Sequence, residues 1–208
     1  MRVYRQWRLD NASVAHYKPS EKGERMRVDG AADRYTGTAI VLHWLSALLI
    51  VSGFTLGISM VDLPISRQKL EWYAWHKWIG ITVFLLTCAR LGWRALHVVP
   101  APVPMPAWQQ RSATISQRLL YVLLLIIPVS GWLYSSSTGV QVVYLNLIPL
   151  PDLVPKDKEL AAVLKAVHVT LNFSLLALVC LHTAAALKHH FVDHDTVLTR
   201  MLPRPRHS

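Results

Sequence analysis

Four histidines of this chain lie inside long apolar runs, where a titratable side chain is costly and usually serves a function. His168 and His182 bound the run HVTLNFSLLALVCLH, and two further apolar runs contain His43 and His76. A neutral imidazole offers one nitrogen lone pair, which can bind a metal ion or a haem iron, or exchange a proton. These four residues are therefore the first candidates for a functional site.

The apolar runs that carry the histidines are long enough to cross a membrane. Apolar residues make up 52% of the chain and charged residues only 16%, and the mean hydropathy is +0.29. About 20 consecutive apolar residues span the hydrocarbon core as a helix. A soluble helix of this length would carry a polar stripe, which the centres of these runs lack. The sequence predicts an all-α integral membrane four-helix bundle with spans at Ala39–Met60, Trp75–Leu96, Leu119–Ser137 and Leu160–Lys188.

The distribution of positive charge predicts the orientation of the bundle. Of the 22 Lys and Arg residues, sixteen lie in the N-terminal tail, the second-to-third connection and the C-terminal end, and six lie in the other two connections. Lys and Arg accumulate on the cytoplasmic side of membrane proteins. Both termini are therefore expected in the cytoplasm. Topology and contact with lipid headgroups account for the formal net charge of +10 without nucleic acid as a partner.

The polar composition of the ends divides the chain into a tail and a membrane domain. Residues 1–35 lack apolar periodicity and are expected to form a disordered cytoplasmic tail. Residues 36–203 form the four-span domain, and residues 204–208 form a short tail. Met26 starts a segment that leads into the first span and is a candidate start of the natural protein. Both cysteines, Cys88 and Cys180, fall within spans and are expected to be buried thiols.

Depth in the membrane sorts the four histidines into two pairs. Successive spans run in opposite directions, so His43 and His182 share the cytoplasmic level, and His76 and His168 share the outer level. His168 and His182 are 14 positions apart, which is roughly 21 Å of helical rise and about 40° short of four turns. Both rings therefore leave the same face of the fourth span, one near each edge of the hydrocarbon core.

Two imidazoles facing each other across a bundle are typical of a haem iron with two axial nitrogens. Zinc and copper usually need three or four protein ligands, and neither level offers a carboxylate or thiolate. Small residues could leave room for the macrocycle or could serve close helix packing; they are Gly53, Gly57, Gly80 and Gly131. Arg90 lies 14 residues after His76, on the same helix face at the cytoplasmic level, where it could pair with a haem propionate or snorkel to headgroups.

The sequence resembles the bacterial cytochrome b561 family of diheme membrane proteins over about residues 34–203. The resemblance rests on RYTGTAIVLHWLSA, HKWIGITVFLLTCARLGWR, SGWL and, most specifically, LHTAAALKHHFVDHDTVLTRM. It implies two haem b groups, whose axial ligands are His43, His76, His168 and His182. It also implies electron exchange with quinone in the membrane and with a donor or acceptor on the outer side, as in respiratory electron transport. The quinone pocket of one branch implies a quinone contact at His189.

Other functions fit parts of the pattern. The superoxide oxidase branch of the family passes electrons from superoxide to ubiquinone, which would make this chain an enzyme. An anchor subunit would pass electrons within a larger complex. A proton or metal-ion transporter without haem would also use intramembrane histidines, but such proteins usually carry intramembrane carboxylates or broken helices at the midplane. The span interiors here contain neither Asp nor Glu.

Overall fold

The computed structural model describes residues 34–203 and contains four long helices. The helices are α2 (Gly37–Ser59), α3 (Arg67–Leu96), α4 (Ala107–Thr138) and α5 (Lys158–Phe191). Two short strands, β1 (Val143–Tyr144) and β2 (Ile148–Pro149), lie between α4 and α5, and the 3₁₀ helix η2 (Thr199–Met201) follows α5. Residues 1–33 of the expected 1–35 tail, with the Met26 candidate start, and the last five residues lie outside the described part of the chain.

Each long helix begins or ends at a residue suited to that place. Side chains cap three N-termini: Thr36 Oγ1 accepts from the Ala39 N–H, Ser66 Oγ from the Lys69 N–H, and Asp157 Oδ1 from the Leu160 N–H. Helix α4 ends at Gly139, whose φ of 75° is the left-handed conformation that glycine adopts without strain. Between these caps the helical backbone pairs its own N–H and C=O groups, as a segment crossing lipid must, except at Pro128 inside α4, which has no N–H to donate.

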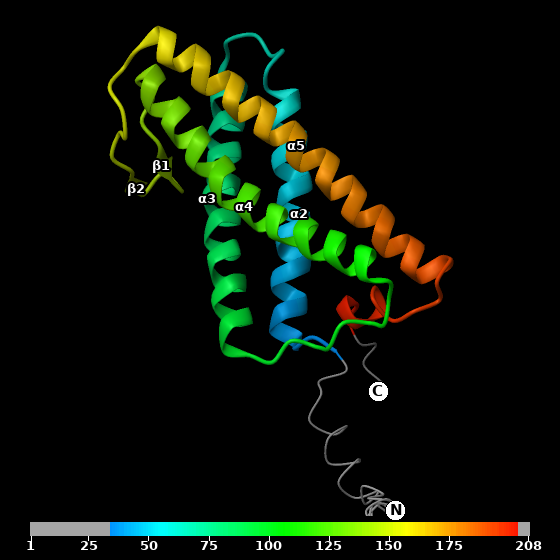
Figure 1. The fold of residues 1–208 in the computed structure, drawn as a ribbon. Helices are drawn as coiled ribbons and strands as arrows, with labels where there is room; N and C mark the ends of the chain where they lie inside the picture. Colours follow the sequence, from blue (N-terminus) through cyan, green and yellow to red (C-terminus); the bar gives the residue numbers. More distant parts are fainter. Residues whose placement is uncertain (1–33, 204–208) are drawn as a thin grey trace, which may run out of the picture.

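The four helices form two hairpins that join through α3 and α4. Helix α2 packs mainly on α3, and α4 packs mainly on α5. Figure 1 shows α2 and α3 side by side and the α4–α5 hairpin crossing them obliquely. We call the end with the α2 start and η2 the termini end, and the end with β1 and β2 the hairpin end. The Arg34 guanidinium and the Trp44 indole N–H hold η2 there, because they donate to the Leu202 and Met201 carbonyls at 2.6 and 2.7 Å.

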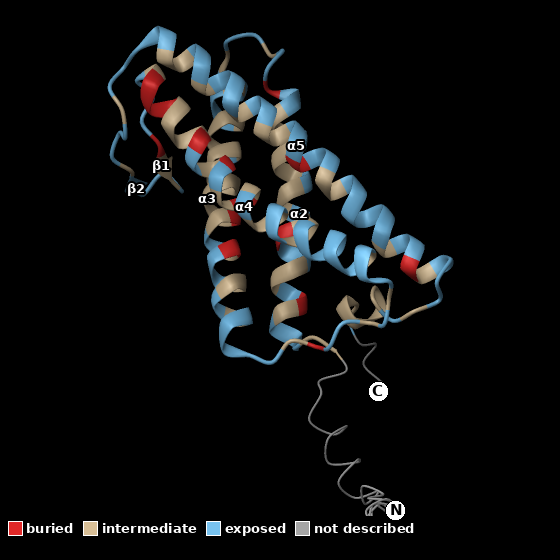
Figure 2. Cartoon of the chain, in the orientation of Figure 1, coloured by how far each residue is buried: buried red, intermediate tan, exposed pale blue. Residues whose placement is uncertain are grey.

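Few residues of the four helices are buried, and most of their length is intermediate or exposed (Figure 2). Many of the side chains exposed on the outer faces of the bundle are large and apolar, such as Val41, Leu48 and Phe173. The largest fully buried side chains are Thr87, Ser46, Ser136 and Ser137. Close packing through small residues is typical of membrane helices, because lipid and protein interior are equally apolar. All four helices are long and apolar enough to span a membrane. Cys88 and Cys180 are exposed on these outer faces, so the expectation that both are buried is wrong.

The helices are longer than the apolar runs that predict them. Helix α3 begins at Arg67 and α4 at Ala107, well before the apolar positions Trp75 and Leu119. Both extra segments are more polar than the apolar runs that they precede, and they extend the two helices beyond those runs. The long third-to-fourth connection folds onto the bundle as the β1–β2 hairpin. The Trp78 indole N–H donates to the Val143 carbonyl at 2.8 Å, which ties this hairpin to α3.

Both ends of the described chain lie at the termini end, and we expect that end to face the cytoplasm. Alkaline phosphatase fused after Ser208 should be inactive, because the enzyme folds only after export, whereas green fluorescent protein at the same point should fluoresce. Alkaline phosphatase fused after Asp152, between the hairpin and α5, should be active. Activity at the C-terminal fusion together with inactivity at the loop fusion would reverse the orientation.

Candidate functional site

The first histidine pair lies at the hairpin end, between α3 and α5. The ring centroids of His76 and His168 are 6.2 Å apart, and the ring planes are nearly perpendicular at 87°. His76 Nδ1 lies 3.0 Å from the Gly53 carbonyl, which can only accept, so Nδ1 carries the proton and donates. The other nitrogen of His76, Nε2, therefore keeps its lone pair.

A serine on α4 fixes the partner ring in the same way. The Ser130 hydroxyl donates to the Ile127 carbonyl at 2.7 Å, so it accepts from His168 Nδ1 at 2.9 Å. His168 Nε2 is then also unprotonated. A hydrogen bond from the second ring nitrogen commonly fixes the tautomer and orientation of a metal-binding histidine. A neighbouring helix thus holds each ring of this pair, and each ring keeps a lone pair on its Nε2.

The second pair lies at the termini end, between α2 and α5. The ring centroids of His43 and His182 are 6.4 Å apart, at an interplanar angle of 63°. Metal–imidazole bonds of about 2 Å on each side, with about 1 Å from each nitrogen to its ring centre, sum to roughly 6 Å. Both pairs therefore have the spacing of two imidazoles on opposite sides of one iron. Their role as haem ligands stays a prediction.

In the pair at the termini end, the His43 ring contacts a hydrogen-bond donor, Arg90, rather than an acceptor. Arg90 Nη2 lies 3.1 Å from His43 Nδ1, and a guanidinium only donates, so His43 Nδ1 is an acceptor in this contact. A neutral His43 then carries its proton on Nε2 and cannot bind iron there. Iron binding through Nε2 requires Arg90 to release His43, and within residues 34–203 Arg90 has no acidic ion-pair partner. A propionate at this level would supply the missing counter-ion.

An apolar cleft adjoins the first pair and separates the helix hairpins. It contains about 470 Å³ of space and is lined by both histidines together with residues such as Phe54, Gly80 and Leu175. A Cβ at Gly80 would meet nothing within 4 Å, so Gly80 leaves open space towards this cleft. A planar apolar macrocycle with two nitrogen ligands fits these surroundings.

The other three glycines have different roles, which the sequence could not separate. A Cβ at Gly131 would lie 2.9 Å from the His168 ring, and one at Gly57 would lie 3.1 Å from the His76 ring. These two glycines make room for the imidazoles. A Cβ at Gly53 would lie 3.2 Å from Ile79, so Gly53 serves the close packing of α2 on α3.

His189 has a carboxylate partner that the sequence analysis missed. This ring is 8% exposed, and its Nδ1 lies 2.5 Å from Asp195 Oδ2. Burial opposes ionisation of Asp195, but hydrogen bonds from the Val197 N–H and from His189 lower its pKa below the usual value. The only signal in the sequence was the DHD run after the helix, and nothing in that run showed that the chain turns back.

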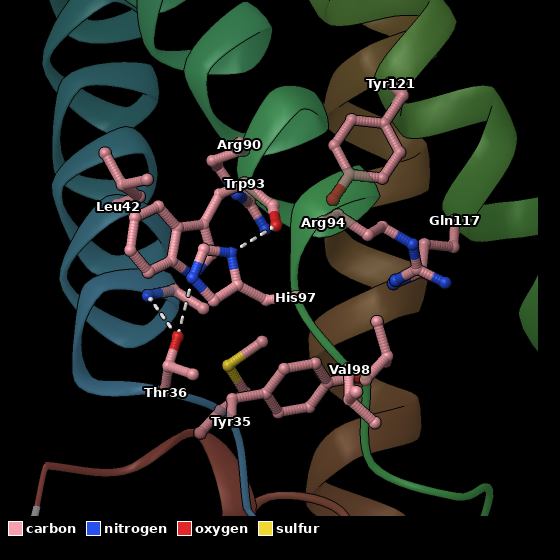
Figure 3. Close-up of a pocket in the computed structure, with 13 residues that line it drawn as sticks. Tyr35, Thr36, Leu42, Arg90, Trp93, Arg94, His97, Val98, Gln117 and Tyr121 are labelled. Atoms are coloured by element: carbon pink, nitrogen blue, oxygen red, sulfur yellow. Dashed lines mark hydrogen bonds between the residues drawn. The ribbon is translucent and has the colours of Figure 1, made fainter.

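A second cleft opens at the termini end, next to Arg90. It contains about 500 Å³ and is lined from α2, α3, α4 and η2. In Figure 3 the Arg94 side chain extends towards Gln117 on α4, and the His97 ring stacks on Trp93. The Trp93 indole N–H donates to Thr36 Oγ1 at 2.8 Å and closes one side of this cleft. Arg90 therefore contacts His43 and also lines this second cleft, whose other lining residues include Arg94.

The chain is similar to known membrane cytochromes over nearly all of its described length. A family model described as "Prokaryotic cytochrome b561" matches residues 34–204. The chain is 33% identical to "Cytochrome b561 homolog 2" of Escherichia coli (strain K12), over 85% of this chain and 95% of that protein. It is 30% identical to "Cytochrome b561 homolog 1" of the same organism, over 83% and 98%. It is also 28% identical to "Probable superoxide oxidase CybB" of Yersinia pestis, over 83% and 98%.

Replacing Gly131 by alanine tests whether the His168 ring position matters for cofactor binding. The added methyl would overlap the ring, and overpacking of this kind costs about 1–3 kcal/mol. We expect Gly131→Ala to lower haem content from about two to about one per chain, because one of two bis-histidine sites is lost. A pyridine haemochrome assay on purified protein measures this ratio.

Gly92→Ala is the matched control, because a Cβ at Gly92 meets nothing within 4 Å and the residue is exposed. It should retain the full haem content. An unchanged spectrum and haem ratio in Gly131→Ala would contradict the assignment of His168 as a ligand.

Proposed function

This chain belongs to the prokaryotic cytochrome b561 family of membrane electron carriers, and we propose that it holds two b-type haems and relays single electrons across the membrane. The observation that carries this proposal is the pair of imidazole distances, 6.2 and 6.4 Å, at opposite ends of one bundle. A haem iron held between two imidazoles has no open position for oxygen, and it supplies one-electron transfer. The chain's own residues bind, orient and insulate the two sites.

Each proposed site is built across the seam between the two helix hairpins. His168 and His182 both come from α5, while their partners come from α3 and α2. Neither helix hairpin alone would therefore supply both ligands of a site. This arrangement supports a role in which the two haems stay at a constant separation.

A small apolar cluster lies between the two levels, and its residues also line the cleft beside the first pair. Val83, Leu124, Ile127 and Leu175 are buried at its centre, with Leu49, Phe54 and Val179 among the residues packed on it. An apolar cluster of this kind excludes water and holds the hairpins together. Water exclusion keeps the dielectric low around each site, which is one of the ways in which a protein adjusts a haem potential.

We further propose that the termini end exchanges electrons with ubiquinone and that the hairpin end serves a donor or acceptor outside the membrane. The second cleft, with Arg90 and Arg94, and the buried His189 supply hydrogen-bond donors at the termini end. Membrane lipid surrounds the apolar outer faces. The alternative is a superoxide oxidase, which the similarity to the Yersinia pestis protein favours.

Removing one ligand from each pair tests the haem assignment. We expect the full chain, produced with haem supplied, to show a b-type spectrum on reduction and about two haems per chain. His76→Ala and His43→Ala should each lose about one haem, because a ligand is missing from one site only. Absorption spectra and haem quantitation measure both results, and a colourless wild-type protein would contradict the proposal.

Stopped-flow spectroscopy of the oxidised protein tests the partner on each side. We expect a short-chain ubiquinol to reduce the haems, because quinone exchange is proposed at the termini end. Superoxide delivered in a separate mixing experiment distinguishes the alternative, since haem reduction that superoxide dismutase abolishes would support superoxide oxidation. A protein whose haems neither ubiquinol reduces nor ubiquinone reoxidises would contradict the quinone role.

A further inference from the structure

The chain turns back on itself immediately after α5 and brings an acidic residue to the helix end. His194 has a φ of 53°, a left-handed conformation that is uncommon outside glycine and costs about 1 kcal/mol or more. After this turn the Asp195 N–H donates to the His189 carbonyl at 3.1 Å. A strained residue of this kind persists only where the surrounding contacts determine it. The turn at His194 therefore places Asp195 beside the end of α5.

Both carboxylate oxygens of Asp195 have a defined partner. Oδ2 lies 2.5 Å from His189 Nδ1, and Oδ1 accepts from the Val197 N–H at 2.9 Å. The neighbouring Asp193 forms an ion pair with Lys188, whose Nζ lies 2.6 Å from Asp193 Oδ2. His189 Nδ1 lies 3.4 Å from the same carboxylate oxygen. The charged groups around the ring are therefore Lys188, Asp193 and Asp195, and Asp195 makes the closest contact.

These contacts explain the cluster better than a metal ion would. His189, Asp193 and Asp195 offer three atoms within 4.8 Å of one another. The His189 ring offers its Nδ1 to Asp195, and Lys188 neutralises Asp193. A cation would have to displace both interactions. The arrangement is that of a carboxylate that orients an imidazole, as is found where histidine exchanges protons.

The His189 ring lies beyond the second histidine pair along α5. His189 follows His182 by seven residues, which is roughly 10 Å of rise and about 20° short of two turns. It therefore shares the face of α5 that carries both proposed ligands, at the termini end. The segment that contains Asp195 is also fixed further on, because Arg200 Nη1 donates to the Ala101 carbonyl at 2.6 Å and Trp44 holds Met201.

We infer that Asp195 is a positioning residue that keeps His189 protonated on Nδ1, so that Nε2 exchanges a proton with a quinone headgroup at the termini end. This inference rests on the proposed quinone function. Contact with Asp195 at Nδ1 leaves the lone pair on Nε2, and the carboxylate stabilises the imidazolium once the proton has arrived. Quinone chemistry needs such a group, because the haem accepts or gives only the electron.

In quinol oxidation, one O–H bond of the quinol breaks and an N–H bond forms at His189 Nε2, while the quinol gives up one electron. A haem held by His43 and His182 would supply the one-electron acceptor. Asp195 stays ionised and pairs with the resulting imidazolium, which later releases the proton at the cytoplasmic surface. In the opposite direction the protonated His189 donates to the reduced quinone. General acid–base groups of this kind typically contribute about 10²- to 10⁴-fold to a rate.

Asp195→Asn in the full haem-loaded protein tests this inference through the rate of haem reduction by short-chain ubiquinol across pH. An asparagine can present its amide N–H to Nδ1 and favour the wrong tautomer, so we expect the rate to fall about tenfold or more. The midpoint of the pH profile should move to lower pH, because the carboxylate no longer stabilises the imidazolium. Asp195→Glu should recover part of the rate and restore the profile.

Asp193→Asn is the matched control, since it removes a neighbouring carboxylate that pairs mainly with Lys188. It should keep the wild-type rate and pH profile. His189→Gln should slow reduction as much as Asp195→Asn, and the double variant should be no slower, because both changes remove one unit. Haem content, dithionite reduction and melting temperature should stay at wild-type values in all variants, which separates a proton role from misfolding.

The outcomes of this experiment distinguish the role of Asp195 from the proposed quinone function. A wild-type rate and pH profile in Asp195→Asn, with quinol still reducing the haems, would overturn the inference and leave the proposed function intact. A rate loss in Asp195→Asn with an unchanged pH profile would also overturn it, because a purely structural role would give that result. Wild-type protein that does not react with quinol at any pH would overturn the proposed quinone function itself.

Discussion

An imidazole inside an apolar bundle must satisfy its N–H group, and this requirement shapes the surroundings of the two histidines at the hairpin end. A buried donor without a partner costs about 1–3 kcal/mol. The Gly53 carbonyl and the Ser130 hydroxyl accept the N–H groups of His76 and His168. Once these bonds are made, each of these two rings keeps one lone pair, on Nε2, that can bind a metal ion. The same contacts that make the histidines tolerable in the membrane thus also prepare them to bind iron.

Small side chains make this arrangement sterically possible. The His168 ring lies against Gly131, which is adjacent to Ser130, so one turn of α4 supplies both the space and the acceptor. On α2, the Gly53 carbonyl accepts from His76, and Gly57 leaves room for the His76 ring. Close helix packing and cofactor accommodation are therefore not alternatives in this bundle. Neighbouring small residues serve both within a single turn.

Depth and helical phase could be read from the sequence because they depend only on regular geometry. A rise of about 1.5 Å per residue and alternating span direction put the histidines into pairs, and α5 indeed carries two of them on one face. The contacts of Ser130 and Asp195 could not be read, because they depend on which helix lies opposite or on a turn at His194. The polar starts of α3 and α4 were missed for a related reason, since hydropathy reports only the part of a helix that lies in lipid. Cys88 and Cys180 were misplaced because an apolar helix has no polar stripe to show which face points outwards.

The two proposed haem sites differ in what surrounds them, and this difference fits a protein that moves charge in steps. At the hairpin end the second partners are a carbonyl and a hydroxyl, which are neutral and buried among helices. At the termini end, the Arg90 guanidinium contacts His43, and the His189–Asp195 pair lies two turns beyond His182. Electrons passing between two sites need no proton if both stay within the apolar bundle, but exchange with a quinone does. An imidazole–carboxylate pair suited to proton exchange is therefore expected at the end where the quinone reacts, and the His189–Asp195 pair lies at that end.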